Sequence, residues 1–164
     1  QMVRLDFYSA TDLNRKAVEE YQLTDTQFTG MPVEVIEECS DDPNRYPMMI
    51  MDDNRLVGFF CLHKEEGPAM YGLMNDKILL RGYSIDSRYR KKGYAKRSFQ
   101  LLVPLVMEHF PDITGIVLGV NHANIPAQKT YQSAGFYDTG LRREGRKGEL
   151  FIYELILKVI SCAG

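Results

Sequence analysis

A short basic turn that contains small residues is the first stretch of the chain whose residue types and spacing suggest chemistry. It runs from Tyr83 to Lys96 and has Gly93 and Ala95 near its end. β-favouring residues precede it and an amphipathic helical pattern follows it, so the turn should open a helix. The first amides of a helix lack internal partners, and small residues let a phosphate approach them. The turn therefore predicts an anion site, with an ordinary strand–helix connection as the alternative.

A second constellation follows the next predicted strand and places an amide, a small residue and a phenol on one helix face. Asn124, Ala127 and Tyr131 are spaced three and four residues apart, which puts them in one row. Asn124 should cap this helix, and Gly135 should end it in the left-handed conformation. Two turns separate the amide from the phenol, roughly 10 Å at about 1.5 Å per residue. A thin polar arm could lie along this face and meet the phenol; the alternative is a capped helix with a core tyrosine.

Together, the two stretches resemble the sequence signatures of the GNAT superfamily of acetyl-CoA-dependent N-acetyltransferases. The first signature, R/Q-x-x-G-x-G/A, is met by Arg90, Gly93 and Ala95. The second, N-x-x-A-x-x-x-Y-x-x-x-G-F, is matched at every position from Asn124 to Phe136. The two occur in the family's order, with a predicted helix and strand between them. We therefore expect an enzyme that transfers the acetyl group of acetyl-CoA to an amine.

The resemblance extends from Leu56 to Leu157, while residues 1–50 fit the family's order of elements but carry no motif. Ser87 stands where the family often has proline, which affects only the expected shape of the turn. The resemblance implies one N-acetyltransferase domain over residues 1–164. It also implies an α/β (mixed α+β) fold, with a mostly antiparallel sheet of about seven strands and helices on both faces.

The resemblance further implies which residues bind the cosubstrate, acetyl-CoA. The amides of the turn would hold the CoA pyrophosphate, and they belong to Arg90, Lys91, Lys92, Gly93, Tyr94, Ala95 and Lys96. Backbone groups near Tyr83, Ser84 and Ile85 would pair with the pantetheine arm as an added strand, and one amide there would polarise the thioester carbonyl. Asn124 would bond to the pantetheine. Tyr131 would line the cofactor site and, as the catalytic residue, protonate the departing thiolate.

The chemistry that fits these residues is direct attack of a neutral amine on the acetyl thioester. The tetrahedral oxyanion needs a fixed amide donor, and the leaving thiolate needs a proton, which a phenol can give. This reaction calls for no metal. No Ser-His-Asp or Cys-His motif is recognisable, so a covalent acyl-enzyme has no candidate nucleophile. The base that deprotonates the amine stays open among Glu37, Asp86, His63 and a chain of waters.

The distribution of charge is the main indication of the acceptor. Residues 1–77 contain 15 acidic and 7 basic side chains, and residues 78–164 contain 7 and 13, so the halves carry net charges of −8 and +6. Two ligands of opposite sign would suit these halves, although two solvated faces would look the same. We expect a small cationic amine of the polyamine type. Aminoglycosides, amino acids, and the N-termini or lysines of peptides and proteins stay open as acceptors.

Three other functions compete with this interpretation. Nucleic-acid binding would use a basic cluster made of Arg88, Arg90, Lys91, Lys92, Lys96 and Arg97, but the overall charge of −2 and the lack of a binding motif disfavour a nucleic-acid partner. A non-catalytic acyl-CoA-binding module would keep the turn but would not need Tyr131. A phosphate-binding NTPase would need Gly-Lys-Ser/Thr, which the turn lacks.

Length and composition set outer limits on the class of protein. The 164 residues suit one domain with a sizeable core. No apolar run is long enough for a membrane span, and no secretory signal is recognisable, so we expect a cytoplasmic protein without a membrane partner. Cys39, Cys61 and Cys162 are odd in number and lack metal or disulfide spacing, which favours free thiols in a reducing compartment. The oligomeric state stays open, a homodimer included.

The remaining elements are expected from periodicity and turn residues. Strands are predicted at 3–7, 46–51, 56–62, 78–85, 116–120, 136–143 and 150–157, with a loop at 63–77. Helices are predicted at 10–22, from Pro32, at 93–110 and at 124–134, with Ser9 as the cap of the first. The helix at 93–110 has an apolar stripe made of Phe99, Leu102, Val103, Val106, Met107 and Phe110. Pro104 should kink this helix.

Overall fold

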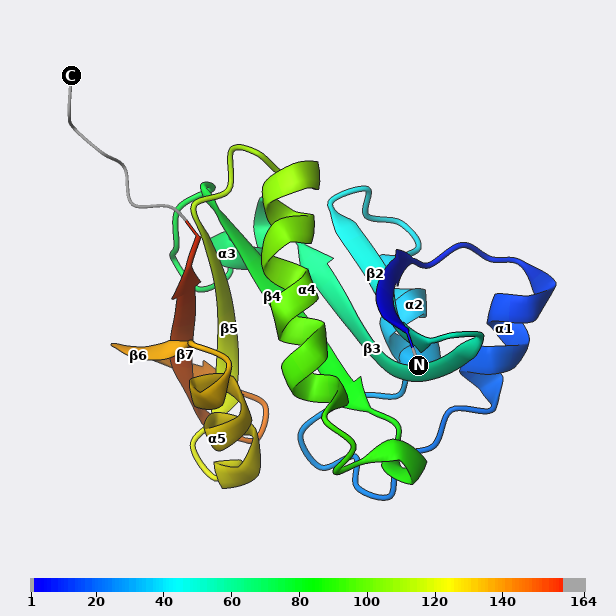
Figure 1. The fold of residues 1–164 in the computed structure, drawn as a ribbon. Helices are drawn as coiled ribbons and strands as arrows, with labels where there is room; N and C mark the ends of the chain where they lie inside the picture. Colours follow the sequence, from blue (N-terminus) through cyan, green and yellow to red (C-terminus); the bar gives the residue numbers. More distant parts are fainter. Residues whose placement is uncertain (1, 158–164) are drawn as a thin grey trace.

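The computed structural model describes residues 2–157, which form a seven-stranded sheet in the order β1-β2-β3-β4-β5-β7-β6 (Figure 1). The strands are β1 (Val3–Phe7), β2 (Arg45–Asp52), β3 (Arg55–His63), β4 (Lys77–Ile85), β5 (Gly115–Asn121), β6 (Tyr137–Gly145) and β7 (Gly148–Ile156). The helices are α1 (Asp12–Glu19), α2 (Pro32–Cys39), α3 (Glu66–Ala69), α4 (Tyr94–His109) and α5 (Ile125–Ser133), with a 3-10 turn η1 (Ser87–Tyr89). Neighbouring strands are antiparallel except β4 and β5. The predicted mostly antiparallel sheet is confirmed.

Apolar side chains at alternate strand positions fill two cores, one on each face of the sheet. Met48 and Ile50 of β2 pack into the core that α4 covers, whereas Met49 and Met51 belong to the core under α1 and α2. This is the period-two alternation of a strand buried on both faces. Figure 1 shows α4 crossing in front of the sheet and α2 behind it. Helices therefore lie on both faces, as the sequence predicted.

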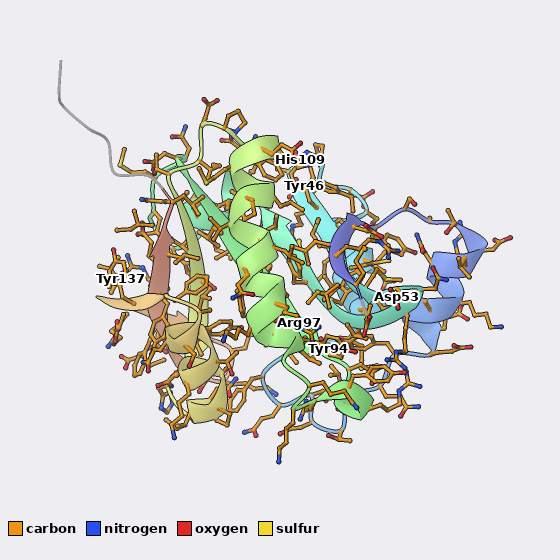
Figure 2. All side chains as sticks on the ribbon, in the orientation of Figure 1. Tyr46, Asp53, Tyr94, Arg97, His109 and Tyr137 are labelled. Atoms are coloured by element: carbon orange, nitrogen blue, oxygen red, sulfur yellow. The ribbon has the colours of Figure 1, made fainter. Side chains whose placement is uncertain are left out.

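The long helix α4 keeps most of its predicted apolar row. The buried members are Phe99, Leu102, Val106 and Phe110. Met107 was wrongly included, because it is 42% exposed. It comes directly after a buried position, and one step along a helix turns a side chain by roughly 100°, toward solvent here. At the far end of the helix, His109 and Tyr46 lie at the edge of this core, where the His109 ring meets Phe7 edge-on at 5.0 Å (Figure 2).

Helix α4 continues through Pro104 without interruption. Proline has no N–H, so the carbonyl of Gln100, four residues earlier, loses its helical partner. Both residues lie on the exposed side of the helix. Water can therefore bond to that carbonyl, which explains why the proline is tolerated.

Two local predictions in the first half of the chain were wrong. Helix α1 is capped by Thr11, whose hydroxyl accepts a hydrogen bond from the Asn14 amide at 3.1 Å, and not by Ser9. The predicted loop at 63–77 contains the short helix α3. Gly67 of α3 packs so closely on His63 that a Cβ would lie 2.8 Å from its ring. Such a contact depends on tertiary packing, which the local pattern does not reveal.

No helix within residues 2–157 is both long enough and apolar enough to cross a membrane.

Candidate active site between β4 and β5

The two parallel strands in the middle of the sheet separate after a short paired stretch. β4 and β5 pair only over Lys77–Leu79 and Gly115–Val117, although β4 continues to Ile85 and β5 to Asn121. Each strand stays paired on its outer side, β4 with β3 and β5 with β7. Within residues 2–157, the inner edges of both strands therefore have no further ladder partner. A cleft of about 1270 Å³ lies in this opening.

Most of the predicted site residues line this cleft. They are Tyr83, Ile85, Arg90, Lys91, Gly93, Tyr94, Ala95, Lys96, Asn124 and Tyr131. Ser84 and Lys92 do not line it. The Ser84 hydroxyl lies on the other face of the sheet, 2.7 Å from the hydroxyl of Tyr21, and the Lys92 carbonyl accepts a hydrogen bond from Arg97 at 2.8 Å. The roles expected of Ser84 and Lys92 use backbone amides, so both stay predictions.

A bulge in β4 bends the backbone beside the cleft. The register between β3 and β4 shifts between Phe59 and Cys61, so Gly82 and Tyr83 together oppose one residue of β3. Gly82 has a φ of +63°, and a Cβ there would lie 2.9 Å from Cγ2 of Val35 on α2. Only glycine fits both conditions. Sequence reasoning missed this bulge, whose one signal was a glycine inside a strand pattern.

The turn before α4 presents the first amides of the helix without a capping side chain. Lys91 and Gly93 have φ values of +62° and +80°, and Gly93 is the N-cap residue. Helices α1 and α5, by contrast, each have a side-chain cap. The cationic side chains of Arg90, Lys91 and Lys96 line the same part of the cleft. Uncapped amides at the positive end of a helix dipole, surrounded by cations, fit the phosphate groups of a ligand.

Tyr94, the first residue of α4, ties this turn to the hairpin between β2 and β3. Its hydroxyl donates a hydrogen bond to Oδ2 of Asp52, and both side chains are buried. The guanidinium of Arg97 lies over the Tyr94 ring, 5.2 Å from its centroid. Figure 2 shows Tyr94 and Arg97 together at this end of the helix. The start of α4 is therefore held by a buried contact, which keeps its amides in a fixed position.

Helix α5 forms the opposite wall as the sequence predicted. The Asn124 side chain caps it by accepting a hydrogen bond from the Ala127 amide at 3.3 Å, and Gly135 after its end has a φ of +102°. Asn124, Ala127 and Tyr131 all line the cleft. Because the cap uses the carbonyl oxygen of Asn124, its NH₂ group is left to donate to a ligand.

Tyr131 has its ring in the core and its hydroxyl available to the cleft. The ring packs edge-on against Tyr83, Phe99 and Phe136, with centroid distances of 6.2, 5.8 and 5.8 Å. The hydroxyl makes no hydrogen bond to any residue in the described range 2–157. Burial raises the pKa of Tyr131 above its ordinary value of 10.0. The phenol is therefore protonated at neutral pH and can act as a donor.

Asp86 and His63, two of the side chains considered as the base, lie outside the cleft and interact with other side chains. Asp86 is fully buried and accepts hydrogen bonds from the Arg88 side chain at 2.8 Å and from a backbone amide at 3.0 Å. Burial alone would raise the pKa of Asp86, but these hydrogen bonds outweigh it and lower the pKa. His63 lies 3.2 Å from both Arg81 Nη1 and Asp42 Oδ2, and burial lowers its pKa. Neither side chain lines the cleft.

Helix α2 instead presents Glu34 and Glu38 to the cleft. They are four residues apart and both line it, whereas Glu37 of the same helix does not. Val35 and Cys39 hold the helix against the sheet, and each glutamate directly precedes one of them, so both flank the buried face. Sequence reasoning missed this pair. The signal available was the spacing of two glutamates beside two apolar residues.

Charges of both signs line the cleft. The acidic residues are Asp25, Glu34 and Glu38, and the basic ones are Arg81, Arg90, Lys91, Lys96, Lys129, Arg146 and Lys147. The acidic half and the basic half of the chain thus meet here. Glu38 Oε2 lies 3.7 Å from Arg45 Nη1, and Glu34 Oε1 accepts a hydrogen bond from the Met31 amide at 3.3 Å. In residues 2–157, no three His, Cys, Asp or Glu side chains gather as metal ligands would.

Comparisons with known proteins agree with this geometry. Residues 10–136 match the family model of the acetyltransferase (GNAT) family. The uncharacterised N-acetyltransferase YbbJ of Bacillus subtilis is 38% identical over 155 residues, covering 93% of this chain and 96% of the relative. The spermine/spermidine N(1)-acetyltransferase of the same organism is 27% identical over 148 residues, covering 83% and 90%. The crystal structure of the ribosomal-protein-S18-alanine N-acetyltransferase from Escherichia coli has a TM-score of 0.70 at 15% identity, covering 99% and 98%.

The chain belongs to the acetyltransferase (GNAT) family. It is an N-acetyltransferase that takes its acetyl group from acetyl-CoA. The family, the enzyme class and the cosubstrate predicted from the two motifs are confirmed.

The first prediction concerns the turn before α4. Gly93→Pro removes an amide and forces a negative φ where the native value is +80°. The Kd for CoA should rise about tenfold or more, because one hydrogen bond to a charged group contributes roughly 1.5–3 kcal/mol. Isothermal titration calorimetry measures this change.

A matched control is available at Gly140, which lies in β6 with a φ of +86° and does not line the cleft. Gly140→Pro imposes the same backbone conflict at a distance, so it should reduce stability and leave CoA affinity unchanged. Equal CoA affinity in folded Gly93→Pro and in the unaltered enzyme would contradict the phosphate site.

Proposed function

We propose that this enzyme acetylates a small cationic amine of the polyamine type, with Tyr131 as the general acid. The observation that carries the proposal is that one cleft brings together three features. They are the open edge of β4, a phenol without a hydrogen-bond partner among residues 2–157, and the acidic wall of α2. Each feature suits one participant in the reaction: the pantetheine arm, the leaving thiolate and the amine.

Binding of acetyl-CoA would use the backbone of β4 and the turn before α4. The stretch from Tyr83 to Ile85 offers an unpaired edge to which an extended arm can add as a strand. The Asn124 NH₂ group faces the same arm from α5. Fixed amides stabilise an oxyanion because they need no reorganisation during the reaction, so a β4 amide at the bulge is the proposed donor to the thioester carbonyl.

The chemistry requires the chain to supply a proton and to hold a neutral amine. The amine nitrogen bonds to the carbonyl carbon as the carbonyl electrons move to oxygen, and the C–S bond breaks when the oxyanion collapses. Tyr131 gives its proton to the leaving thiolate. The phenolate regains a proton as the nitrogen of the new amide loses one, so no net proton stays on the enzyme.

The acidic wall supports a cationic acceptor. Glu34 and Glu38 present two carboxylates about one helical turn apart, and Asp25 also lines the cleft. A chain with several ammonium groups can bond to such carboxylates while one neutral amine reaches the thioester. The name of one relative, spermine/spermidine N(1)-acetyltransferase, agrees with an acceptor of this kind.

The second prediction tests the general acid. Tyr131→Phe keeps the ring in its aromatic cluster but removes the proton donor, so kcat should fall by about 10²–10⁴ while the Kd for acetyl-CoA stays nearly constant. Steady-state kinetics and calorimetry measure the two quantities. The control is Tyr153→Phe, which removes a buried hydroxyl that is bonded to Gln132 at 3.0 Å outside the cleft. An unchanged kcat in Tyr131→Phe, with chemistry shown to limit the rate, would reject the catalytic role.

The third prediction concerns pH. Since burial raises the pKa of Tyr131 above 10.0, the phenol keeps its proton throughout the usual assay range. The neutral fraction of an alkyl amine grows as pH approaches its own pKa of about 10.4. The value of kcat/KM should therefore increase between about pH 6 and about pH 9 without a descending limb. A descending limb near pH 8 that is lost in Tyr131→Phe would show that the phenol ionises early, against this account.

The fourth prediction concerns the acceptor. Replacing both carboxylates, Glu34→Gln with Glu38→Gln, should raise KM for a polyamine roughly twofold to thirtyfold, because exposed ion pairs each contribute roughly 0.2–1 kcal/mol. The effect should shrink as salt screens the charges. Glu37→Gln removes the same charge from the same helix outside the cleft and serves as the control. Equal KM values in the double variant and the control would exclude this wall as the amine site.

A further inference from the structure

Two cysteines that the sequence keeps apart lie side by side in the core under α1 and α2. Cys39 is the last residue of α2, and Cys61 lies two residues before the end of β3. Their sulfur atoms are 3.5 Å apart, and one thiol hydrogen-bonds to the other. Both are free thiols, and Phe59 and Val35 belong to the same core. A disulfide has an S–S distance of about 2.05 Å, so a small approach of the sulfurs joins helix to strand.

The surroundings give the two sulfurs different reactivity. The hydrogen bond from Cys61 lowers the pKa of Cys39, and the positive charges of Arg45 and Arg81 act in the same direction against the effect of burial. The hydrogen bond with Cys39 and burial raise the pKa of Cys61. Cys39 also lies nearer the surface, with 9% of its area exposed against 1% for Cys61. Cys39 is therefore suited to react first, with Cys61 as the thiol that completes the bond.

We propose that Cys39 and Cys61 form an oxidisable dithiol, which hydrogen peroxide converts into a disulfide between α2 and β3. The Cys39 thiolate attacks one peroxide oxygen, the O–O bond breaks and hydroxide leaves, which gives a sulfenic acid. The Cys61 sulfur then attacks the Cys39 sulfur, and the sulfenic oxygen leaves as water. In sum, two thiols and one peroxide give one disulfide and two waters. A small dithiol such as dithiothreitol reverses the step by thiol–disulfide exchange.

The disulfide would fix the helix that carries the acidic wall. Glu34 and Glu38 are on α2, and Val35 of the same helix contacts the β4 bulge at Gly82. A covalent bond at Cys39 therefore sets the position of these carboxylates relative to β3 and β4. This consequence for the acceptor rests on the proposed function, whereas formation of the disulfide does not.

The experiment uses the full chain with Cys162→Ser, which removes the cysteine that lies outside the described residues. The protein is fully reduced, treated with one equivalent of hydrogen peroxide and measured by intact-mass spectrometry and peptide mapping. We expect a loss of about 2 Da and a Cys39–Cys61 cross-linked peptide, both reversed by dithiothreitol. The oxidised form should melt roughly 5–10 °C higher, because the cross-link constrains the unfolded chain.

Cys61→Ala in the same background keeps Cys39 but cannot form the bond, and Cys39→Ala is its counterpart. Both place a small apolar residue in the core, and neither should lose about 2 Da. An unchanged mass in the two-cysteine protein, a gain of oxygen atoms without cross-linking, or covalent dimers would overturn the dithiol.

Kinetics of the oxidised and reduced forms test the link to the acceptor. We expect KM for the amine to change at least about threefold on oxidation, with KM for acetyl-CoA unaltered. An unchanged KM for the amine in a protein shown to carry the disulfide would overturn the link to the acidic wall.

Discussion

The early separation of β4 and β5 is the constraint on which the rest of the structure depends. Their pairing ends at Leu79 and Val117, and the backbone groups beyond need other partners, because unpaired buried N–H and C=O groups are costly. Every residue of β5 pairs with β7, which holds β5 on its outer side. The Tyr71 hydroxyl packs against Gly119 of β5, where a Cβ would lie only 3.0 Å from it. The fold thus holds open an edge that a ligand can complete.

The side chains that stabilise the fold around this opening also place the chemical groups. One aromatic cluster of Tyr83, Phe99, Tyr131 and Phe136 joins β4, α4 and α5. Each buried ring contributes roughly 1.5–3 kcal/mol to folding, so the position of the phenol follows from the packing of the core. In the same way, the contact of Tyr94 with the β2–β3 hairpin fixes the position of the amides in the turn before α4. A substitution in this cluster should therefore alter stability and catalysis together, unless it removes a hydroxyl and keeps the ring.

The parts of the site that the sequence predicted are those that depend on neighbouring residues. The Asn124 cap and the open turn at Gly93 follow from local backbone chemistry, which spacing reveals. The parts it missed depend on contacts between distant segments. A glycine is required at position 82 because α2 packs closely on the β4 bulge. Which glutamates of α2 face the cleft depends on how this helix packs on the sheet. The same packing brings Cys39 of α2 close to Cys61 of β3. The mostly antiparallel sheet was predictable only through the family resemblance, because strand pairing is a property of the whole fold.

The central claim is that acetyl-CoA completes the open edge of β4 and bonds to the amides of the turn. Amide hydrogen exchange, measured by mass spectrometry with and without CoA, tests this most directly, because an amide that gains a hydrogen bond exchanges more slowly. The account predicts slower exchange in two segments, 80–85 and 91–96, with little change in β1 and β6. Protection confined to other segments, or no protection at 80–85 under saturating CoA, would contradict it.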